Sequence, residues 1–167
     1  MKKIVLSALV ILGLTLTSCG PTKKDALKYN DEIVNVQKAL TPIHEAFIDQ
    51  LDGHNVDSLK IVYHNFTEGV KSSLEACEKI QAFNDKRDYL DAAITYFKVM
   101  KSITENEGKN MADLMSKDST QVSPDDETKY NEYATKFDSD YEKALETVQK
   151  AQFTFAKEWK LDLMEKP

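Results

Sequence analysis

The chain has 167 residues, of which 41% are hydrophobic and 30% are charged, with only five Gly, four Pro and two Cys. This composition is typical of one globular domain, and so few turn-forming residues argue against a β-sandwich, a collagen-like repeat or a low-complexity chain. The formal net charge is −6 at pH 7, and Arg87 is the sole arginine. An arginine cluster for phosphate groups is therefore excluded, and the acidic balance disfavours nucleic acid as a partner.

The N-terminus has the three parts of a secretory signal. Two lysines follow Met1, residues 4–17 are mostly apolar, and small residues lead up to Cys19. An apolar run of about fourteen residues is shorter than the roughly twenty that cross a bilayer as a helix. We therefore interpret residues 1–18 as a cleaved leader that is not part of the fold.

Leu16, Thr17, Ser18 and Cys19 resemble the lipobox of bacterial lipoproteins. The resemblance implies that a dedicated peptidase cuts before Cys19, which then carries a diacylglyceryl thioether and, in many bacteria, an acyl chain on its amine. Each buried acyl methylene contributes about 0.8 kcal/mol, so such lipids would hold a domain at a membrane surface without spanning it. The alternatives are an ordinary cleaved leader with an incidental cysteine, or a buried core cysteine at this position.

Removal of the leader would leave a lipidated cysteine and polar tether at residues 19–25 and a helical bundle domain at residues 26–167. Without the two lysines of the leader, 20 of the 22 basic residues remain against 28 acidic ones, a balance of −8. Lipidation of Cys19 would leave Cys77 without a disulfide partner in the chain. We therefore expect the domain to be stabilised by a hydrophobic core of ordinary size.

After the tether, apolar residues recur at gaps of three and four, which is the spacing of one helix face. The members of this first stripe are Tyr29, Ile33, Val36, Leu40, Ile43, Phe47 and Leu51. Pro42 cannot donate to the carbonyl four residues earlier, so we expect a kink near residues 38–42, or a break with Thr41 capping a second segment. The unbroken register favours the kink, and residues 52–55 form the first turn.

Two further stripes follow with the same spacing. The second contains Val56, Leu59, Tyr63, Phe66, Val70, Ser73, Cys77 and Ile80, flanked by Val62, Leu74 and Phe83, and Asn84 and Asp85 mark its end. The third contains Leu90, Ala93, Phe97, Met100, Ile103, Met111, Leu114 and Met115. Residues 105–108 interrupt this third stripe, and we expect a break or bend there.

The last helix has a clear start. Residues 116–122 form the longest polar connection, after which Ser123 can cap a helix, Pro124 suits its first position and three acidic residues face the positive end of the macrodipole. The stripe that follows is Tyr130, Tyr133, Phe137, Tyr141, Ala144, Val148, Ala151, Phe155 and Trp159. Four long helices with mostly short links predict an all-α, antiparallel up-and-down four-helix bundle. A longer coiled-coil oligomer is the structural alternative, and the oligomeric state is not predicted.

Three evenly spaced histidines are the candidate metal ligands. His54 lies in the first turn, while His44 and His64 would lie at similar heights on antiparallel helices. Glu45, Asp57 and Glu68 are near in sequence and could complete a zinc or copper site. However, His44 and His64 each lie one position off an apolar stripe, which favours solvated positions and no metal. The chain also lacks the Glu-x-x-His pairs of di-iron bundles and the Cys-x-x-Cys-His of covalent haem.

The remaining reactive residue types have structural interpretations. We expect Cys77 to be a buried thiol, and Met100, Met111 and Met115 to fill the core and not to ligate haem. The glycines are too far apart for a nucleotide loop or a nucleophile elbow. Seven acids between Glu105 and Glu127 are predicted to form a solvated acidic end, with weak calcium binding or a basic partner as the alternatives. Aromatic residues of the last helix should pack in the core, although they could line a ligand groove, and Phe153 is the outlier whose exposure should be checked.

Residues 29–34 (YNDEIV) are similar to the opening of small helical lipoproteins of Gram-negative bacteria, of the Bacteroidetes type, which implies no activity. We therefore expect a non-catalytic, lipid-anchored envelope protein that needs no cofactor, contacts the membrane through Cys19 and binds an envelope protein or glycan, or serves as a spacer. Gly20 in place of Asp after the cysteine favours the outer membrane, and residues 20–25 are compatible with either the periplasmic or the outer face. The alternatives are a small-molecule or metal carrier using the bundle interior or the His44/His64 face, and an envelope hydrolase with an unrecognised site.

Overall fold

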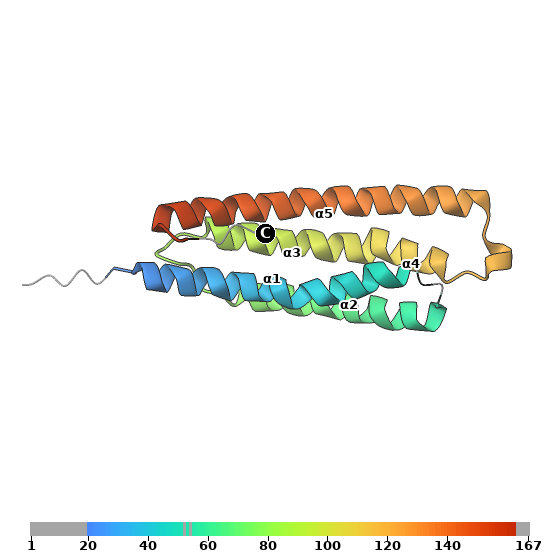
Figure 1. Cartoon of the computed structure of the whole chain (residues 1–167), viewed down its shortest axis with the longest axis horizontal. Coiled ribbons are helices and arrows are strands. Elements are labelled where there is room, and N and C mark those ends of the chain that lie inside the picture. Colours follow the sequence, from blue (N-terminus) through green and yellow to red (C-terminus); the bar gives the residue numbers. More distant parts are fainter. Residues whose placement is uncertain (1–19, 52, 54, 163–167) are drawn as a thin grey trace, which may run out of the picture.

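The computed structural model describes residues 20–51, 53 and 55–162. The predicted leader, Cys19 and His54 lie outside these residues. The described part of the chain forms four helical rods and contains no β-strand, only an isolated bridge between Phe83 and Lys86 (Figure 1). The predicted all-α, up-and-down bundle is therefore confirmed.

Helix α1 (Lys23–Leu51) begins inside the segment predicted as a tether. Thr22 and Asp25 cap each other: the Thr22 amide and Oγ1 donate to Asp25 Oδ2 at 2.9 and 2.6 Å, and the Asp25 amide donates to Thr22 Oγ1 at 3.3 Å. This reciprocal cap satisfies amides that would otherwise lack partners, so the helix starts earlier than its apolar stripe. The prediction that residues 19–25 are all tether is wrong at its C-terminal end.

Helix α1 continues through Pro42. The break that would have made Thr41 a second cap does not occur. Thr41 instead donates from Oγ1 to the carbonyl of Gln37, at 3.4 Å. The helix tolerates Pro42 because the large apolar side chains on both sides of it, Leu40 and Phe47, are buried in the same core and hold the two halves in register.

Helix α2 (Val56–Glu78) is capped by Asn55, whose side chain accepts from the Ser58 amide at 3.0 Å. It ends before Ile80, the last member of its predicted stripe, and in the link that follows Ile80 is buried and the flanking Phe83 is half-buried. A two-residue turn closes this link: Asn84 and Asp85 have φ of 52° and 60°. Phe83 and Lys86 exchange backbone hydrogen bonds across the turn, at 3.2 and 3.0 Å.

The third rod consists of α3 (Asp88–Ile103), a π-helical turn (Thr104–Gly108) and α4 (Lys109–Met115). The interruption predicted at residues 105–108 is therefore a wider turn within a continuous rod and not an end. A π-turn inserts one extra residue and rotates the following side chains around the helix axis. That rotation buries Glu107 and Gly108, which the apolar pattern did not predict.

Helix α5 (Pro124–Trp159) has 36 residues and spans about 54 Å at 1.5 Å per residue. Its start is as predicted: Ser123 and Asp126 form a capping box, and Pro124 occupies the first turn. At its other end Lys160 adopts a left-handed φ of 52°, and the Leu161 amide donates to the Ala156 carbonyl at 2.8 Å. Leu161 and Ala156 then pack against Ala26 of α1.

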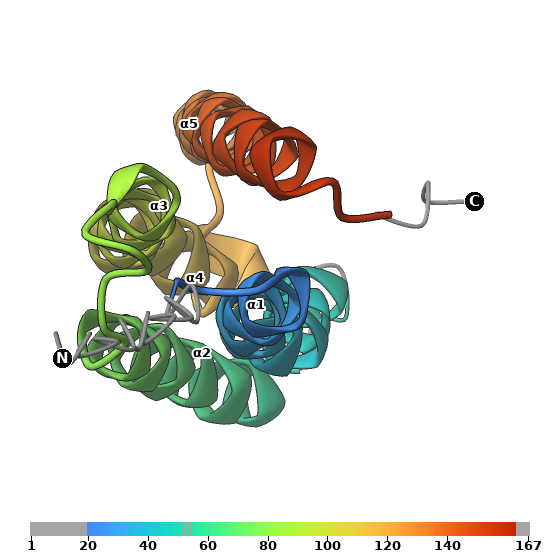
Figure 2. The same ribbon diagram turned by 90° about the vertical axis from the view of Figure 1, so that its left-hand side faces the viewer.

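Consecutive helices are neighbours in the bundle. Helix α1 packs mainly on α2, α2 on α3, and α3 on α5, as the end view also shows (Figure 2). The first two helices approach closely at Gly69, where an added Cβ would lie 3.1 Å from Ile43 Cδ1. Within the described residues, every helix is too short or too polar to cross a membrane.

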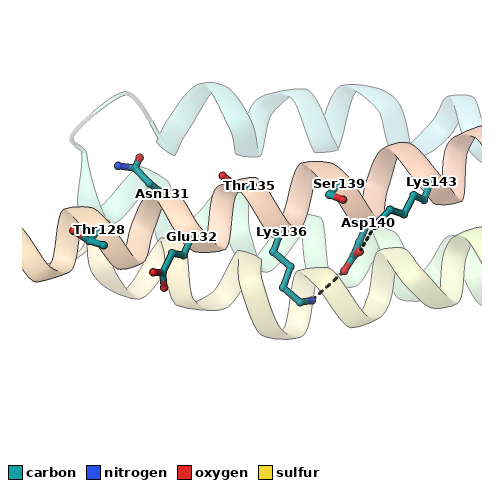
Figure 3. A pocket seen from close by; sticks show the side chains of 8 residues that line it. All are labelled: Thr128, Asn131, Glu132, Thr135, Lys136, Ser139, Asp140 and Lys143. Carbon is teal, nitrogen blue, oxygen red and sulfur yellow. Dashed lines mark hydrogen bonds and ion pairs between the residues drawn. The ribbon is translucent and has the colours of Figure 1, made fainter.

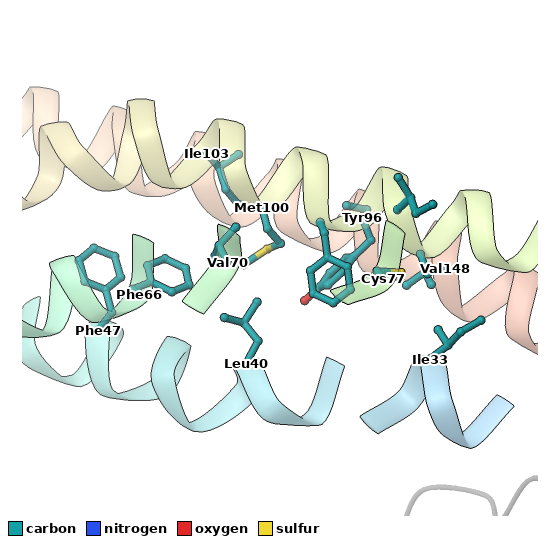
Figure 4. Close-up of a cluster of buried hydrophobic side chains, with 14 of the residues drawn as sticks. Ile33, Leu40, Phe47, Phe66, Val70, Cys77, Tyr96, Met100, Ile103 and Val148 are labelled. Carbon is teal, nitrogen blue, oxygen red and sulfur yellow. The ribbon is translucent and has the colours of Figure 1, made fainter. Parts of the chain in front are cut away.

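The predicted stripes form one continuous core along the bundle (Figure 4). Its largest fully covered side chains include four phenylalanines, Phe47, Phe66, Phe97 and Phe137. Helix α3 buries more of its surface than its stripe predicts, because it lies between α2 and α5. The additional buried side chains are Tyr89, Ile94 and Tyr96.

Candidate functional site

The His44 ring is half-buried against the aromatic core, and not solvated as its position off the stripe predicted. Its ring packs on Phe66, Phe137 and Tyr141, with centroids 5.2, 5.9 and 5.0 Å away. Nε2 is buried and has no hydrogen-bond partner. Desolvation lowers the pKa of His44 below 6.5, although the nearby carboxylates of Glu45 and Asp138 act in the opposite direction. The imidazole is therefore an element of the aromatic core.

This environment predicts a pH-dependent stability. Because the folded-state pKa of His44 is depressed, the unfolded chain binds a proton more readily than the folded chain as the pH falls below about 6.5. The stabilisation that neutral His44 provides is complete above that pH. It decreases as the pH falls from about 6.5 to the folded-state pKa of His44. We expect the free energy of unfolding of His44→Leu, measured by urea denaturation, to fall less between pH 7 and pH 5 than that of the unsubstituted chain. His64→Gln, at an exposed position, is the matched control, and equal pH slopes for all three proteins would contradict the assignment.

Among the described residues, the candidate ligands do not form a metal centre, and His54 lies outside those residues. His64 is exposed on α2, whereas His44 is enclosed by aromatic rings. No group of three or more His, Cys, Asp or Glu residues that could hold a metal ion occurs in the described parts of the chain. The described part of the His44/His64 face thus offers no cluster of ligands on which a metal carrier could be argued.

The acidic segment between Glu105 and Glu127 is not a uniformly solvated surface. Glu107, in the π-turn, is only 8% exposed and forms an ion pair with Lys136 of α5, with an N–O distance of 2.6 Å. Four other acids of the segment also pair with lysines: Glu105 with Lys101, Asp113 with Lys109, Asp125 with Lys129 and Asp126 with Lys117. The prediction of a solvated acidic end is wrong for Glu107, because the π-turn rotates it toward α5.

Cys77 is a fully buried free thiol, as predicted. Burial raises its pKa to about 11, which disfavours the nucleophilic thiolate. Met100 and Met111 are buried in the same core, and Met115 packs against it. Phe153, the expected outlier of the last helix, is 64% exposed.

A polar surface runs along the outer side of α5 (Figure 3). It includes Thr135, Lys136, Ser139, Asp140 and Lys143, and all of its residues belong to this one helix. Lys136 and Lys143 both pair with Asp140, at 3.0 and 3.8 Å. A single helix is convex and cannot enclose a ligand, so this surface is a poor candidate for a binding site.

The distal groove is the largest of the three surface depressions that we describe, with a volume of about 890 Å³. It lies where α2 and α5 begin and α4 ends, at the opposite end of the bundle from the start of α1 (Figure 1). Its apolar lining is Val56, Leu114, Met115, Val122 and Tyr130. Its charged lining is Lys117, Asp118, Asp126 and Glu127.

Two of those charged residues hold the groove together. Lys117 pairs with Asp126 at 2.6 Å, and Asp126 also accepts from the amide and hydroxyl of Ser123, at 3.0 and 2.9 Å. The Lys117 and Ser123 bonds lower the pKa of Asp126 to about 2. Asp118 accepts from the Thr120 amide at 2.9 Å and thereby starts a short 3₁₀ turn, Ser119–Gln121. The polar connection at residues 116–122 is therefore an ordered wall of the groove.

The aromatic groove lies between α3 and α5, near the end of the bundle where α1 begins, and has a volume of about 320 Å³. Tyr29 of α1, Tyr89 of α3 and Phe155 of α5 line it, and Phe155 lies 5.3 and 5.6 Å from the two tyrosine rings. Ala92 and Ala151 line it as well. Lys86 and Glu158 form an ion pair at its rim, linking the Asn84–Asp85 turn to α5.

Sequence reasoning located neither groove as a cavity. It raised an aromatic ligand groove on the last helix as an alternative to core packing, and Phe155 and Tyr130 do line grooves as well as packing on the core. The sequence does not show which small side chains of a neighbouring helix lie opposite these aromatic rings, and that arrangement determines whether a groove forms. Comparison with models of protein families, with curated proteins and with solved structures finds no match for this chain.

Proposed function

We propose that this protein is a lipid-anchored module of a bacterial cell envelope, more specifically of the outer membrane, which binds a protein partner and catalyses no reaction. The lipobox-like residues at Leu16–Cys19 support the anchor, since α1 begins at Lys23 and would stand close to a membrane-bound Cys19. The bundle would then extend from that surface by about the length of α5, some 54 Å.

The position of the distal groove is the observation that carries the binding role. It is the largest groove described and lies at the end of the bundle farthest from the proposed anchor, where a partner can reach it. Its apolar lining would bury a hydrophobic side chain of the partner, and Val122, which belongs to that lining, is 42% exposed.

The charges of the groove indicate which kind of partner would fit. Lys117 already neutralises Asp126, so the remaining acids, Asp118 and Glu127, make the rim negative. A protein segment with an apolar side chain next to a lysine or arginine would complement both parts of the groove. A neutral glycan would use the apolar lining less well.

Site-specific photocrosslinking in the native envelope tests this proposal. With a benzophenone side chain in place of Val122, we expect one protein to be captured that is not captured from Ile61, an equally apolar but remote exposed position on α2. Glu127→Lys should lower the yield several-fold, because it reverses a rim charge, whereas Glu142→Lys, elsewhere on α5, should not. Equal capture from Val122 and Ile61, or no effect of Glu127→Lys, would overturn the proposal. Capture of a glycan without any protein would show that the partner is a glycan and not a protein.

A further inference from the structure

We infer that the aromatic groove is a binding site for a small, flat, mostly apolar molecule that carries an acceptor oxygen such as a ketone or quinone carbonyl. This site is separate from the distal groove and independent of the proposed anchor, so either proposal can fail without the other. It also differs from the carrier expected from the sequence, which would use the bundle interior or the histidines.

The hydroxyl groups of the two tyrosines that line the groove have no hydrogen-bond partner among the described residues. Tyr29 and Tyr89 are 6% and 3% exposed, and the hydroxyl oxygen of each is buried without a hydrogen-bond partner. An unpaired buried polar group destabilises a fold by about 1–3 kcal/mol, and phenylalanine at either position would avoid that loss. Both tyrosines line the same groove, and a partner that enters it from outside would satisfy hydroxyls that the described residues leave unpaired.

The same burial decides what the hydroxyls can offer. Desolvation raises the pKa of Tyr29 to about 12 and that of Tyr89 further, so both remain protonated at physiological pH. A neutral phenol can donate its hydrogen to an oxygen of the ligand. The lysines of the lining, Lys86 and Lys150, are exposed, and Lys86 is already paired with Glu158, so a neutral carbonyl fits the buried hydroxyls better than a carboxylate.

The shape of the groove selects a flat ring. Ala92 on α3 and Ala151 on α5 have short side chains, which leave space between the two helices beside Phe155. The aromatic floor continues behind the groove, because Phe83 stacks on Tyr29 at 5.2 Å and meets the Trp159 ring at 5.0 Å. A volume of about 320 Å³ is at the small end of ligand sites, which suits one or two fused rings.

The half-buried Phe155 side chain is the group that would have to rotate when a ligand enters the groove. It contacts both tyrosine rings and lines the groove, so the proposed binding requires this one side chain to rotate before a ligand reaches the floor. The surrounding frame is held by the Lys86–Glu158 ion pair and by a hydrogen bond from Gln152 Nε2 to Asn30 Oδ1 at 2.9 Å. With this frame in place, the proposed binding requires rotation of the Phe155 ring but no separation of the helices.

A pair of isosteric probes tests the inference on the purified full-length chain with ¹³C-labelled alanine methyl groups. We expect 2-acetylnaphthalene to shift the Ala92 and Ala151 methyl resonances and to leave that of the exposed Ala39 on α1 unchanged. The isostere 2-isopropenylnaphthalene, which replaces the carbonyl oxygen with a methylene, should bind at least tenfold more weakly. No shift at Ala92 and Ala151 with up to about 1 mM ketone, or equal affinity for both probes, would overturn the inference.

Two variants separate a binding role from a structural one. In Tyr29→Phe/Tyr89→Phe, we expect the melting temperature to stay the same or rise and the affinity for the ketone to fall at least tenfold. Ala151→Leu should abolish binding of both probes, since it fills a groove that is open in the fold. Unchanged ketone affinity in the double variant would overturn the inference, and if that variant fails to fold, the comparison of the two probes on the unsubstituted chain decides.

Discussion

Phe66→Asp should leave the domain unfolded. The Phe66 ring is 0% exposed and packs between Phe47, at 5.0 Å, and His44, at 5.2 Å. Truncation of a buried phenylalanine alone costs about 3–5 kcal/mol, and the carboxylate adds the desolvation of an unpaired charge. Domains of this size are stable by about 5–15 kcal/mol, so the combined loss removes most or all of the stability. Circular dichroism at 222 nm should show a large loss of helix at 25 °C.

Phe153→Asp is the matched control for this prediction. It makes the same chemical change on α5, but Phe153 is 64% exposed, so the carboxylate would remain hydrated. We expect its melting temperature to lie within a few degrees of the unsubstituted chain. If Phe66→Asp also melted normally, the assignment of the second stripe to the core would be refuted.

Cys19→Ala should abolish the membrane association of the mature chain. Cys19 lies outside the described residues, and the prediction rests on its lipobox-like context. Without the thiol there is no thioether-linked diacylglycerol, and the acyl methylenes that contribute about 0.8 kcal/mol each are lost. After fractionation, the chain should move from the membrane pellet to the supernatant, and its intact mass should lack the lipid.

The second cysteine provides the control for this experiment. Cys77→Ala removes a buried thiol of α2, which we expect to affect stability but not the distribution between membrane and supernatant. Intact mass also separates a retained leader from a lipid, because both could hold the chain in the pellet. A Cys19→Ala chain that lacks residues 1–18 and still sediments with the membrane would contradict the proposed anchor.

Much of the fold could be predicted because the information is local. The gaps of three and four placed Leu40, Phe66 and Phe137 on buried faces, and the core contains all three. Ser123 and Pro124 marked the start of α5 because a cap and a first-turn proline satisfy amides within four residues. The start of α1 was misplaced because the reciprocal Thr22–Asp25 cap lies outside the apolar pattern.

The candidate sites were less predictable for a specific reason. His44 is one position from Ile43 on its helix, and helical spacing alone places it at the edge of the stripe. Only the presence of Phe137 and Tyr141 of α5 beside α1 makes that edge part of the core. Glu107 is covered for a similar reason, because the π-turn directs it toward Lys136.

The sequence by itself determined the helices, their apolar faces and their up-and-down order, because periodicity, caps and short links act over a few residues. Only the tertiary structure decided which side chains from different helices share a space. The aromatic groove depends on Tyr29, Tyr89 and Phe155, which belong to three helices and are up to 126 residues apart in the chain. Ala92 and Ala151 leave that groove open, and nothing in their positions in the sequence indicates this until α3 packs against α5. The hydroxyls of Tyr29 and Tyr89 became candidates for ligand binding only when burial removed the water that would otherwise pair with them.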